Sequence, residues 1–193
     1  MQGAIVCLRR DKMQISKFGI ANAEDVISAY EDIIGMKLPE QMILFIKKYN
    51  GGETPNTNFK CGQTSSDIKG FYGLGSVRFS LDKIKPFERN ERKYLPVALD
   101  SFGNDVVIDL QTGKVAFSDH ETGSITVLCE DLRSFINICN SESVSNGAVK
   151  TVEQRERALI EKGRGNIITD ALRDMWRAEI AKYGAMDLEK VSI

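Results

Sequence analysis

The chain has 193 residues, with 26 Lys and Arg against 27 Asp and Glu, and a hydrophobic content of 42%. This length is enough for one good hydrophobic core and a small appendage, and the balanced charge excludes a disordered tail or a broadly basic nucleic-acid binder. An early apolar run, 4–8, has five residues and is closed by two arginines, so it predicts neither a signal peptide nor a membrane span.

The four cysteines stand at positions 7, 61, 129 and 139 and include no C-x-x-C pair. Scattered cysteines in a chain without a signal are typical of reduced thiols in a cytosolic protein. A zinc site requires clustered ligands, and the single histidine argues further against one. We therefore expect a cytoplasmic protein that uses no metal or other cofactor.

Two helices are predicted in the first 50 residues. The first starts at Ala23 with Asn22 as its cap and stops at Gly35, and the second opens at Pro39 and ends at 50–52, Asn-Gly-Gly. Apolar side chains recur at helical spacing in both. The two helices form the first recognisable unit of the fold.

Residues 53–75 are rich in Thr, Asn, Ser and Gly, which predicts loops with one or two short strands. The next segment, 77–93, carries a net charge of plus three. Leu81, Ile84 and Phe87 predict a short helix there, limited by Pro86. Interleaved carboxylates favour a solvated surface over a phosphate-binding site.

Glycine returns every ten residues, at 103, 113 and 123, between four β-rich runs of about six residues. Each glycine can supply the positive φ of a tight hairpin, so the period predicts a four-stranded antiparallel meander over about 95–130. Asp131 then caps a closing helix whose apolar side chains return onto the sheet. The meander and the helices together predict a closed α+β unit.

A polar linker, 140–147, precedes two further helices. The second has Asn166 as its cap, Gly184 as its stop and an apolar stripe that includes Trp176, which we expect to pack within the chain rather than against another. We therefore predict an α+β domain over 1–140 and a helical extension over 147–193, whose deletion leaves a folded core. The oligomeric state stays open between a monomer and a dimer formed through the C-terminal helices.

Several short motifs follow one another over about residues 20–140, namely Glu31 and Gly35, Leu38-Pro39-Glu40, Asn50-Gly51-Gly52, Leu95-Pro96, Gly103-Asn104, Asp109-Leu110, Gly113-Lys114-Val115 and Asp119-His120-Glu121. Their order and spacing resemble the SUKH superfamily, which contains bacterial immunity proteins and fungal regulators of cell-wall glucan synthesis. Ser118 departs from the aromatic that the family often has there.

The resemblance implies an α+β fold with helices packed on one side of a mainly antiparallel sheet. It also implies a protein-binding module with no known catalytic activity. Our first interpretation is an immunity protein that binds and neutralises a cognate toxin, often a nuclease in this superfamily. The alternative is a signalling or scaffold module of the fungal type. Neither interpretation includes direct contact with nucleic acid or with a membrane.

His120, between Asp119 and Glu121, suggests a hydrolase as a third hypothesis. Adjacent strand residues point to opposite faces, so the three side chains cannot converge without a bulge. We favour a structural role, in which both carboxylates bond turn amides and His120 satisfies a local acceptor.

Residues 100–121 of the predicted meander contain five carboxylates with Lys114 as their offset, a local net charge of minus four. We predict that they form a partner-binding strip that imitates nucleic acid and steers a basic toxin. The equal alternative is that they cap turns and protect the sheet edge from aggregation. These residues are Asp100, Asp105, Asp109, Asp119 and Glu121.

Overall fold

The computed structural model describes residues 12–18, 20–142, 151–183 and 188–193. The chain divides into two compact units. The α+β unit contains the residues up to Glu142 together with Glu189–Ile193, and the helical unit contains Ser143–Leu188. We describe each unit by itself.

Three helices belong to the α+β unit: α1 (Ala23–Ile34), α2 (Glu40–Tyr49) and α3 (Leu132–Ile138). All three predictions of helices are confirmed. Asp131 caps α3 by accepting a hydrogen bond from the Ser134 amide at 2.7 Å. Asn22 lies at the N-cap of α1, but its side chain does not cap the helix, because its backbone is left-handed rather than extended.

The meander is the centre of a six-stranded antiparallel sheet. Gly103, Gly113 and Gly123 have φ angles of 95°, 75° and 65°, so each occupies the left-handed conformation that its turn requires. The strand order is β4-β6-β7-β8-β9, and β5 pairs with β6. The strands are β4 (Gly70–Phe71), β5 (Phe87–Arg89), β6 (Arg92–Leu99), β7 (Asp105–Asp109), β8 (Val115–Ser118) and β9 (Ile125–Cys129).

The prediction of a short helix around residues 81–87 is wrong. A single turn forms, in which the Ile84 amide donates to the Leu81 carbonyl at 2.8 Å. Phe87 instead begins β5 and packs on Tyr94 of β6, with 5.7 Å between ring centroids. Cross-strand pairing and aromatic packing outweigh the helical spacing of three apolar residues that Pro86 already interrupts.

A smaller sheet has the order β10-β2-β3, with β2 (Thr57–Cys61), β3 (Thr64–Ile68) and β10 (Cys139–Ser141). β2 and β3 lie in the segment where one or two short strands are predicted, and β4 adds a third. β10 includes the first two residues of the predicted linker.

The end of the chain returns to the α+β unit. β1 (Gln14–Ser16) pairs with β11 (Leu188–Lys190), and the Val191 amide donates to the Met13 carbonyl at 2.9 Å. The Tyr49 hydroxyl bonds the Glu189 carboxylate at 3.0 Å. The predicted extension, 147–193, therefore includes five residues that belong to the first unit, and its deletion would remove them as well.

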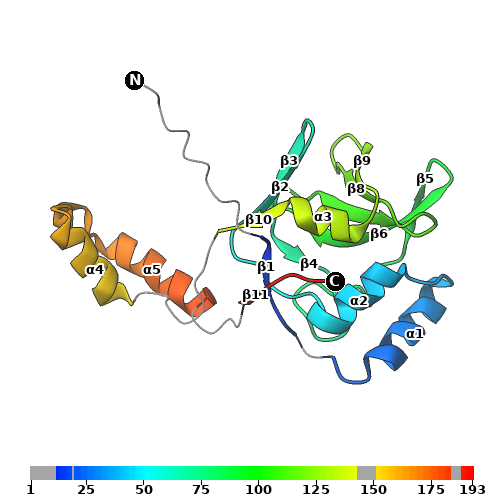
Figure 1. The fold of residues 1–193 in the computed structure, drawn as a ribbon, viewed down its shortest axis with the longest axis horizontal. Helices are drawn as coiled ribbons and strands as arrows, with labels where there is room; N and C mark the ends of the chain where they lie inside the picture. The colour runs from blue at the N-terminus through cyan, green and yellow to red at the C-terminus, as the bar shows by residue number, and fades with distance from the viewer. Residues whose placement is uncertain (1–11, 19, 143–150, 184–187) are drawn as a thin grey trace. The chain divides into compact units, whose positions relative to one another are not determined.

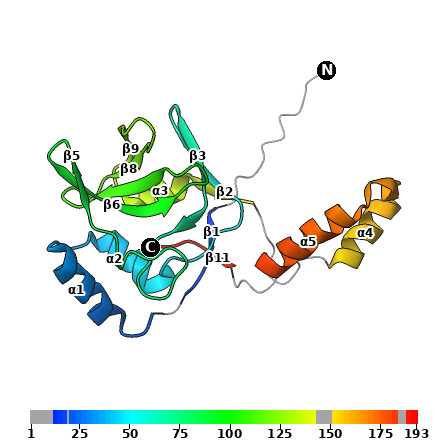
Figure 2. The ribbon, with the colours of Figure 1, turned by 180° about the vertical axis from the view of Figure 1, so that it is seen from behind.

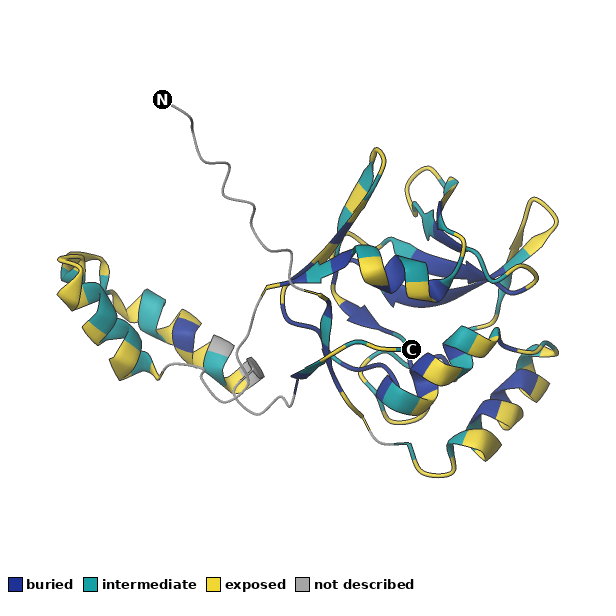
Figure 3. Cartoon of the chain, viewed as in Figure 1, coloured by how far each residue is buried: buried dark blue, intermediate teal, exposed yellow. Residues whose placement is uncertain are grey.

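The core of the α+β unit joins the helices to both sheets. Phe45 of α2 packs on Phe71 of β4 with 4.9 Å between ring centroids, and Phe59 of β2 packs on Phe135 of α3 at 5.4 Å. In Figure 1 α3 crosses in front of the large sheet, and in the reversed view of Figure 2 it lies behind that sheet. Buried positions concentrate in the central strands and on the inner sides of the helices (Figure 3).

The helical unit contains α4 (Val152–Glu161), a short 3-10 turn (Gly165–Ile167) and α5 (Asp170–Tyr183). Asn166 lies in the 3-10 turn, so the prediction that it caps α5 is wrong; the Thr169 hydroxyl accepts from the Leu172 amide at 3.2 Å instead. Gly184 lies outside the described residues.

Trp176 of α5 is 9% exposed, and the Arg155 guanidinium of α4 lies 5.9 Å from its ring centroid. Trp176 thus packs within its own unit, as expected. In the described part of the chain, no helix is both long and apolar enough to span a bilayer.

Candidate functional site

Three hairpin turns of the meander are built by the same device. An aspartate at or just beyond the end of one strand accepts hydrogen bonds from backbone amides two to four residues later. The aspartates are Asp100 before the β6–β7 turn, Asp109 before the β7–β8 turn and Asp119 before the β8–β9 turn. Aspartate commonly bonds its own backbone in this way, so the device explains why the acidic residues recur with the glycines.

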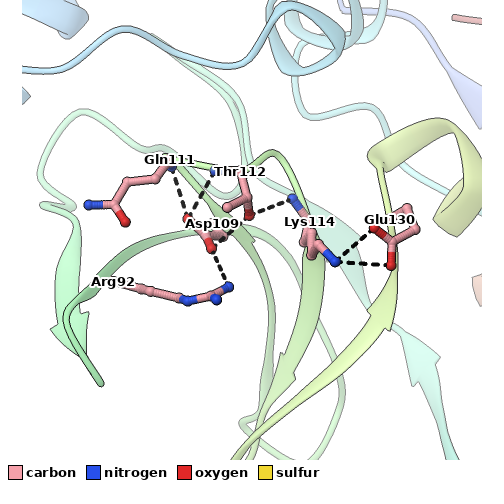
Figure 4. Close-up of polar contacts among 6 residues, drawn as sticks. All are labelled: Arg92, Asp109, Gln111, Thr112, Lys114 and Glu130. Carbon is pink, nitrogen blue, oxygen red and sulfur yellow. Dashed lines mark hydrogen bonds and ion pairs between the residues drawn. The ribbon is translucent and has the colours of Figure 1, made fainter.

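The buried Asp109 carboxylate accepts the hydrogen bonds that hold the β7–β8 turn (Figure 4). One carboxylate oxygen accepts from the amides of Gln111 at 2.9 Å and Thr112 at 3.3 Å. The other accepts from the Thr112 hydroxyl at 2.7 Å and from Arg92 Nη1 at 3.0 Å. Burial alone raises the pKa of Asp109, but these hydrogen bonds outweigh it and hold the pKa below its usual value. Only 1% of Asp109 is exposed, so a partner cannot reach it.

Asp100 is also buried, at 2% exposed. It accepts hydrogen bonds from the amides of Phe102 at 2.9 Å and Asn104 at 2.8 Å, from the Asn104 side chain at 2.8 Å and from the Ser66 hydroxyl at 2.7 Å. Burial raises the pKa of Asp100, and these bonds together lower it below its ordinary value. Its role is to fix the turn, and a partner would sense its charge without touching it.

The third turn contains the histidine. Asp119 accepts from the amides of Glu121 and Thr122, both at 2.9 Å, and these bonds lower its pKa. His120 is exposed; its amide donates to the side-chain oxygen of Asn104 at 3.1 Å, and its ring Nδ1 lies 2.9 Å from the same atom. The predicted contacts of Asp119 and His120 are therefore present, whereas no described hydrogen bond joins the Glu121 carboxylate to a turn amide. Glu121 gives its own amide to the turn, and its side chain is exposed.

Asp105 lies at the start of β7, beside Asp100. It is half-buried and accepts from the Tyr72 hydroxyl at 3.1 Å. Burial raises its pKa, and the neighbouring charge of Asp100 acts in the same direction. The surroundings of Asp105 therefore disfavour its ionised form.

A further aspartate completes this side of the meander. Asp67 of β3 accepts from the Ser101 amide at 3.1 Å and from the Ser101 hydroxyl at 2.5 Å. We define the acidic turn end as residues 66–67, 100–105 and 119–124, which contain five carboxylates and no lysine or arginine. The guanidinium of Arg89, on β5, lies next to Gly123 of this end. Its Nη1 is 2.6 Å from the position that a Cβ would take if Gly123 carried one.

The structure thus separates the predicted strip into two groups. Asp100, Asp105, Asp119 and Glu121 gather at the acidic turn end, whereas Asp109 lies at the opposite end of β7 with Arg92. The sequence did not indicate Asp67, because it reaches Ser101 from a strand 34 residues earlier in the chain.

Other groups of polar or sulfur-containing side chains are weaker candidates for a functional site. Within the described ranges, no three or more His, Cys, Asp or Glu side chains are arranged to hold a metal ion. The Cys61 thiol donates to the Leu128 carbonyl at 3.1 Å, and burial raises the pKa of Cys129 to about 11, which disfavours a reactive thiolate. A cavity of about 450 Å³ is lined mainly by lysine and asparagine side chains, namely Lys12, Asn58, Lys60, Asn137 and Asn140.

Comparison with known proteins agrees with the motif pattern. The model of the SMI1 / KNR4 family (SUKH-1) matches residues 21–138, well over half of the chain. The chain belongs to this SUKH-1 family. A SUKH-1 assignment also agrees with the observed α+β fold, in which antiparallel sheets and helices share one core.

A curated relative of this SUKH-1 protein is the SPbeta prophage-derived uncharacterized protein YokK of Bacillus subtilis (strain 168). It is 27% identical over 135 residues, which cover 59% of this chain and 70% of the relative. No solved structure matches the chain significantly. The SUKH-1 match includes the whole meander and ends before the helical unit, so the acidic turn end belongs to the family domain.

Proposed function

We propose that this SUKH-1 protein is an immunity protein, a non-catalytic module that binds and neutralises a cognate toxin in the cytoplasm. The observation that carries the proposal is the acidic turn end, where five carboxylates occur without a lysine or arginine in a chain of net charge minus one. Its partner is a protein with a basic surface, and a toxin that cleaves nucleic acid has one. The alternative, a signalling scaffold, needs no such charge.

The way in which these carboxylates are satisfied supports the proposal. Asp67, Asp100 and Asp119 accept hydrogen bonds from backbone amides, hydroxyls and an amide side chain, all of them neutral donors. Such donors hold these three carboxylates in place without themselves cancelling the negative charge. A cluster of this kind steers a cationic partner and raises the association rate.

The side chains that a hydrolase would use have structural roles. The His120 ring contacts Asn104, and Asp119 holds the amides of its own turn. These contacts tie the β8–β9 turn to the β6–β7 turn. They support a non-catalytic binding role over the hydrolase hypothesis.

The relative favours immunity over the fungal type of scaffold. YokK is derived from a prophage of a bacterium, and bacterial SUKH proteins are typically immunity proteins. This likeness supports an immunity role for the chain. A eukaryotic gene with no toxin-like neighbour would instead favour the scaffold.

The test is to express the neighbouring gene, which we expect to encode a toxin-like domain, with and without the chain in the same cells. We expect the chain to restore growth and to bind the purified domain, and His120→Ala to protect within a fewfold of the parent. No binding and no protection would contradict the proposal. A folded His120→Ala variant that lost protection by about 10²–10⁴-fold would indicate catalysis instead.

A further inference from the structure

Phe102 lies at the tip of the β6–β7 turn and is 71% exposed, the most of any large apolar side chain in the described part of the chain. Exposed apolar side chains are common singly and need no explanation by themselves. Phe102 differs because it belongs to the acidic turn end, where its amide donates to the Asp100 carboxylate.

Three hydrogen bonds fix the backbone around Phe102. Asp100 accepts from the Phe102 amide at 2.9 Å, within the turn itself. On one side, Asp67 of β3 accepts from the Ser101 amide at 3.1 Å. On the other side, Asn104 accepts from the His120 amide at 3.1 Å, which links the turn to the β8–β9 turn.

These hydrogen bonds hold the turn in place before a partner binds, which affects the free energy of binding. A loop that must become ordered on binding loses affinity, whereas a rigid turn avoids that cost. Aromatic residues that fill a pocket on the partner contribute much of the binding energy in many interfaces, especially when a polar rim surrounds them. A rigid turn that presents an aromatic ring within a polar rim has both properties.

We propose that Phe102 is the apolar anchor of the toxin interface and inserts into an apolar recess that lysine and arginine residues surround on the partner. The inference rests on the proposed function and specifies its contact. The charge of the acidic turn end selects the partner. Its residues include five carboxylates and no lysine or arginine, so a basic protein surface is favoured and nucleic acid is repelled.

The test compares Phe102→Ala with Ile33→Ala in binding to the adjacent toxin-like domain. Ile33 is 64% exposed and lies on α1, which packs on α2, so the control removes a similar exposed apolar group elsewhere. We expect Phe102→Ala to raise the Kd about tenfold or more, and Phe102→Leu to recover part of the loss. Ile33→Ala should leave the Kd within about twofold, and all three variants should melt like the parent.

Three outcomes are informative. If the parent binds and protects but Phe102→Ala binds equally well, the anchor is wrong and the proposed function stands. If the parent neither binds nor protects, the proposed function fails, and the anchor fails with it. If Phe102→Ala leaves toxin binding intact and changes the sedimentation of the chain alone, Phe102 contacts a second copy of the chain, which also overturns the inference.

Discussion

The two ends of the meander use the same aspartate device and present different surfaces. At the β7–β8 turn, Arg92 pairs with Asp109 at 3.0 Å and Lys114 pairs with Glu130 at 2.8 Å (Figure 4). At the acidic turn end, Asp100 and Asp119 are held by neutral donors. The turn aspartate at one end is therefore paired with a cation, while the turn aspartates at the other end are held by neutral donors.

This difference separates the structural role of a turn aspartate from its effect on a partner. A hydrogen bond from an amide satisfies a carboxylate locally and leaves its charge in place, whereas an adjacent guanidinium also cancels the charge at a distance. Burial does not decide whether the charge of a turn aspartate is cancelled, since Asp100 and Asp109 are similarly buried, at 2% and 1% exposed. What decides it is whether the donor is charged.

The largest expected effect is on stability. Asp109→Ala should lower the free energy of unfolding by about 3 kcal/mol, because it leaves two turn amides and a hydroxyl without their acceptor and Arg92 without its partner. Urea unfolding monitored by circular dichroism measures this loss. Asp119→Ala is the matched control at the acidic turn end and should cost clearly less, since its turn is exposed. Equal losses would show that burial does not distinguish the two turns.

The pH dependence follows from the same carboxylates. Asp100 and Asp109 have lowered folded pKa values, so their stabilisation is complete above the unfolded value of about 4 and is lost as the pH falls through the folded values. Urea unfolding from pH 7 to pH 3 should show the steepest loss below about pH 4. Asp109→Asn should flatten this loss. A loss that is complete well above pH 5 would contradict the assignment.

Asp105→Asn and Asp100→Asn should change the stability of the fold at pH 7 in opposite directions. The folded pKa of Asp105 is raised, so its contribution is complete below the unfolded value and is lost as the pH rises through the folded value. At pH 7 the asparagine keeps an acceptor for Tyr72 and removes a disfavoured charge, so stability should be unchanged or rise by up to about 1 kcal/mol. Asp100→Asn should destabilise, because its amide group cannot accept from all the present donors. Thermal melts of the pair at pH 7 compare the two.

His120→Ala should have the smallest effect. Its amide, which donates to Asn104, is retained, and the exposed ring contact is the only described bond that disappears. We expect the melting temperature to move by less than about 2 °C. A large drop would mean that the ring itself holds the two turns together.

The sequence predicted the meander well because the information is local. Alternating apolar residues and a glycine at 103, 113 and 123 act within a single hairpin, and the observed φ angles follow from them. Asp131 capped its helix for the same reason. Local chemistry was sufficient for these elements.

The surface of the meander was not predictable in this way. Whether Asp100 or Asp109 meets a cation depends on strand register, which brings Tyr94 opposite Asp109 and thereby places Arg92 beside that turn. The bracing by Asp67 and the return of 189–193 to β1 join segments far apart in the sequence. Such contacts arise only when the sheets assemble.

The most direct test of the account measures the association rate of the chain with the adjacent toxin-like domain as ionic strength rises. We compare the parent with Glu121→Lys, at the exposed rim of the acidic turn end, and with Asp32→Lys on α1 as a control of equal charge change. The account predicts that the parent rate falls steeply with salt, and that Glu121→Lys lowers the low-salt rate severalfold, well beyond Asp32→Lys. A rate that ignores salt, or that falls equally for both variants, would contradict the claim that the acidic turn end receives the partner.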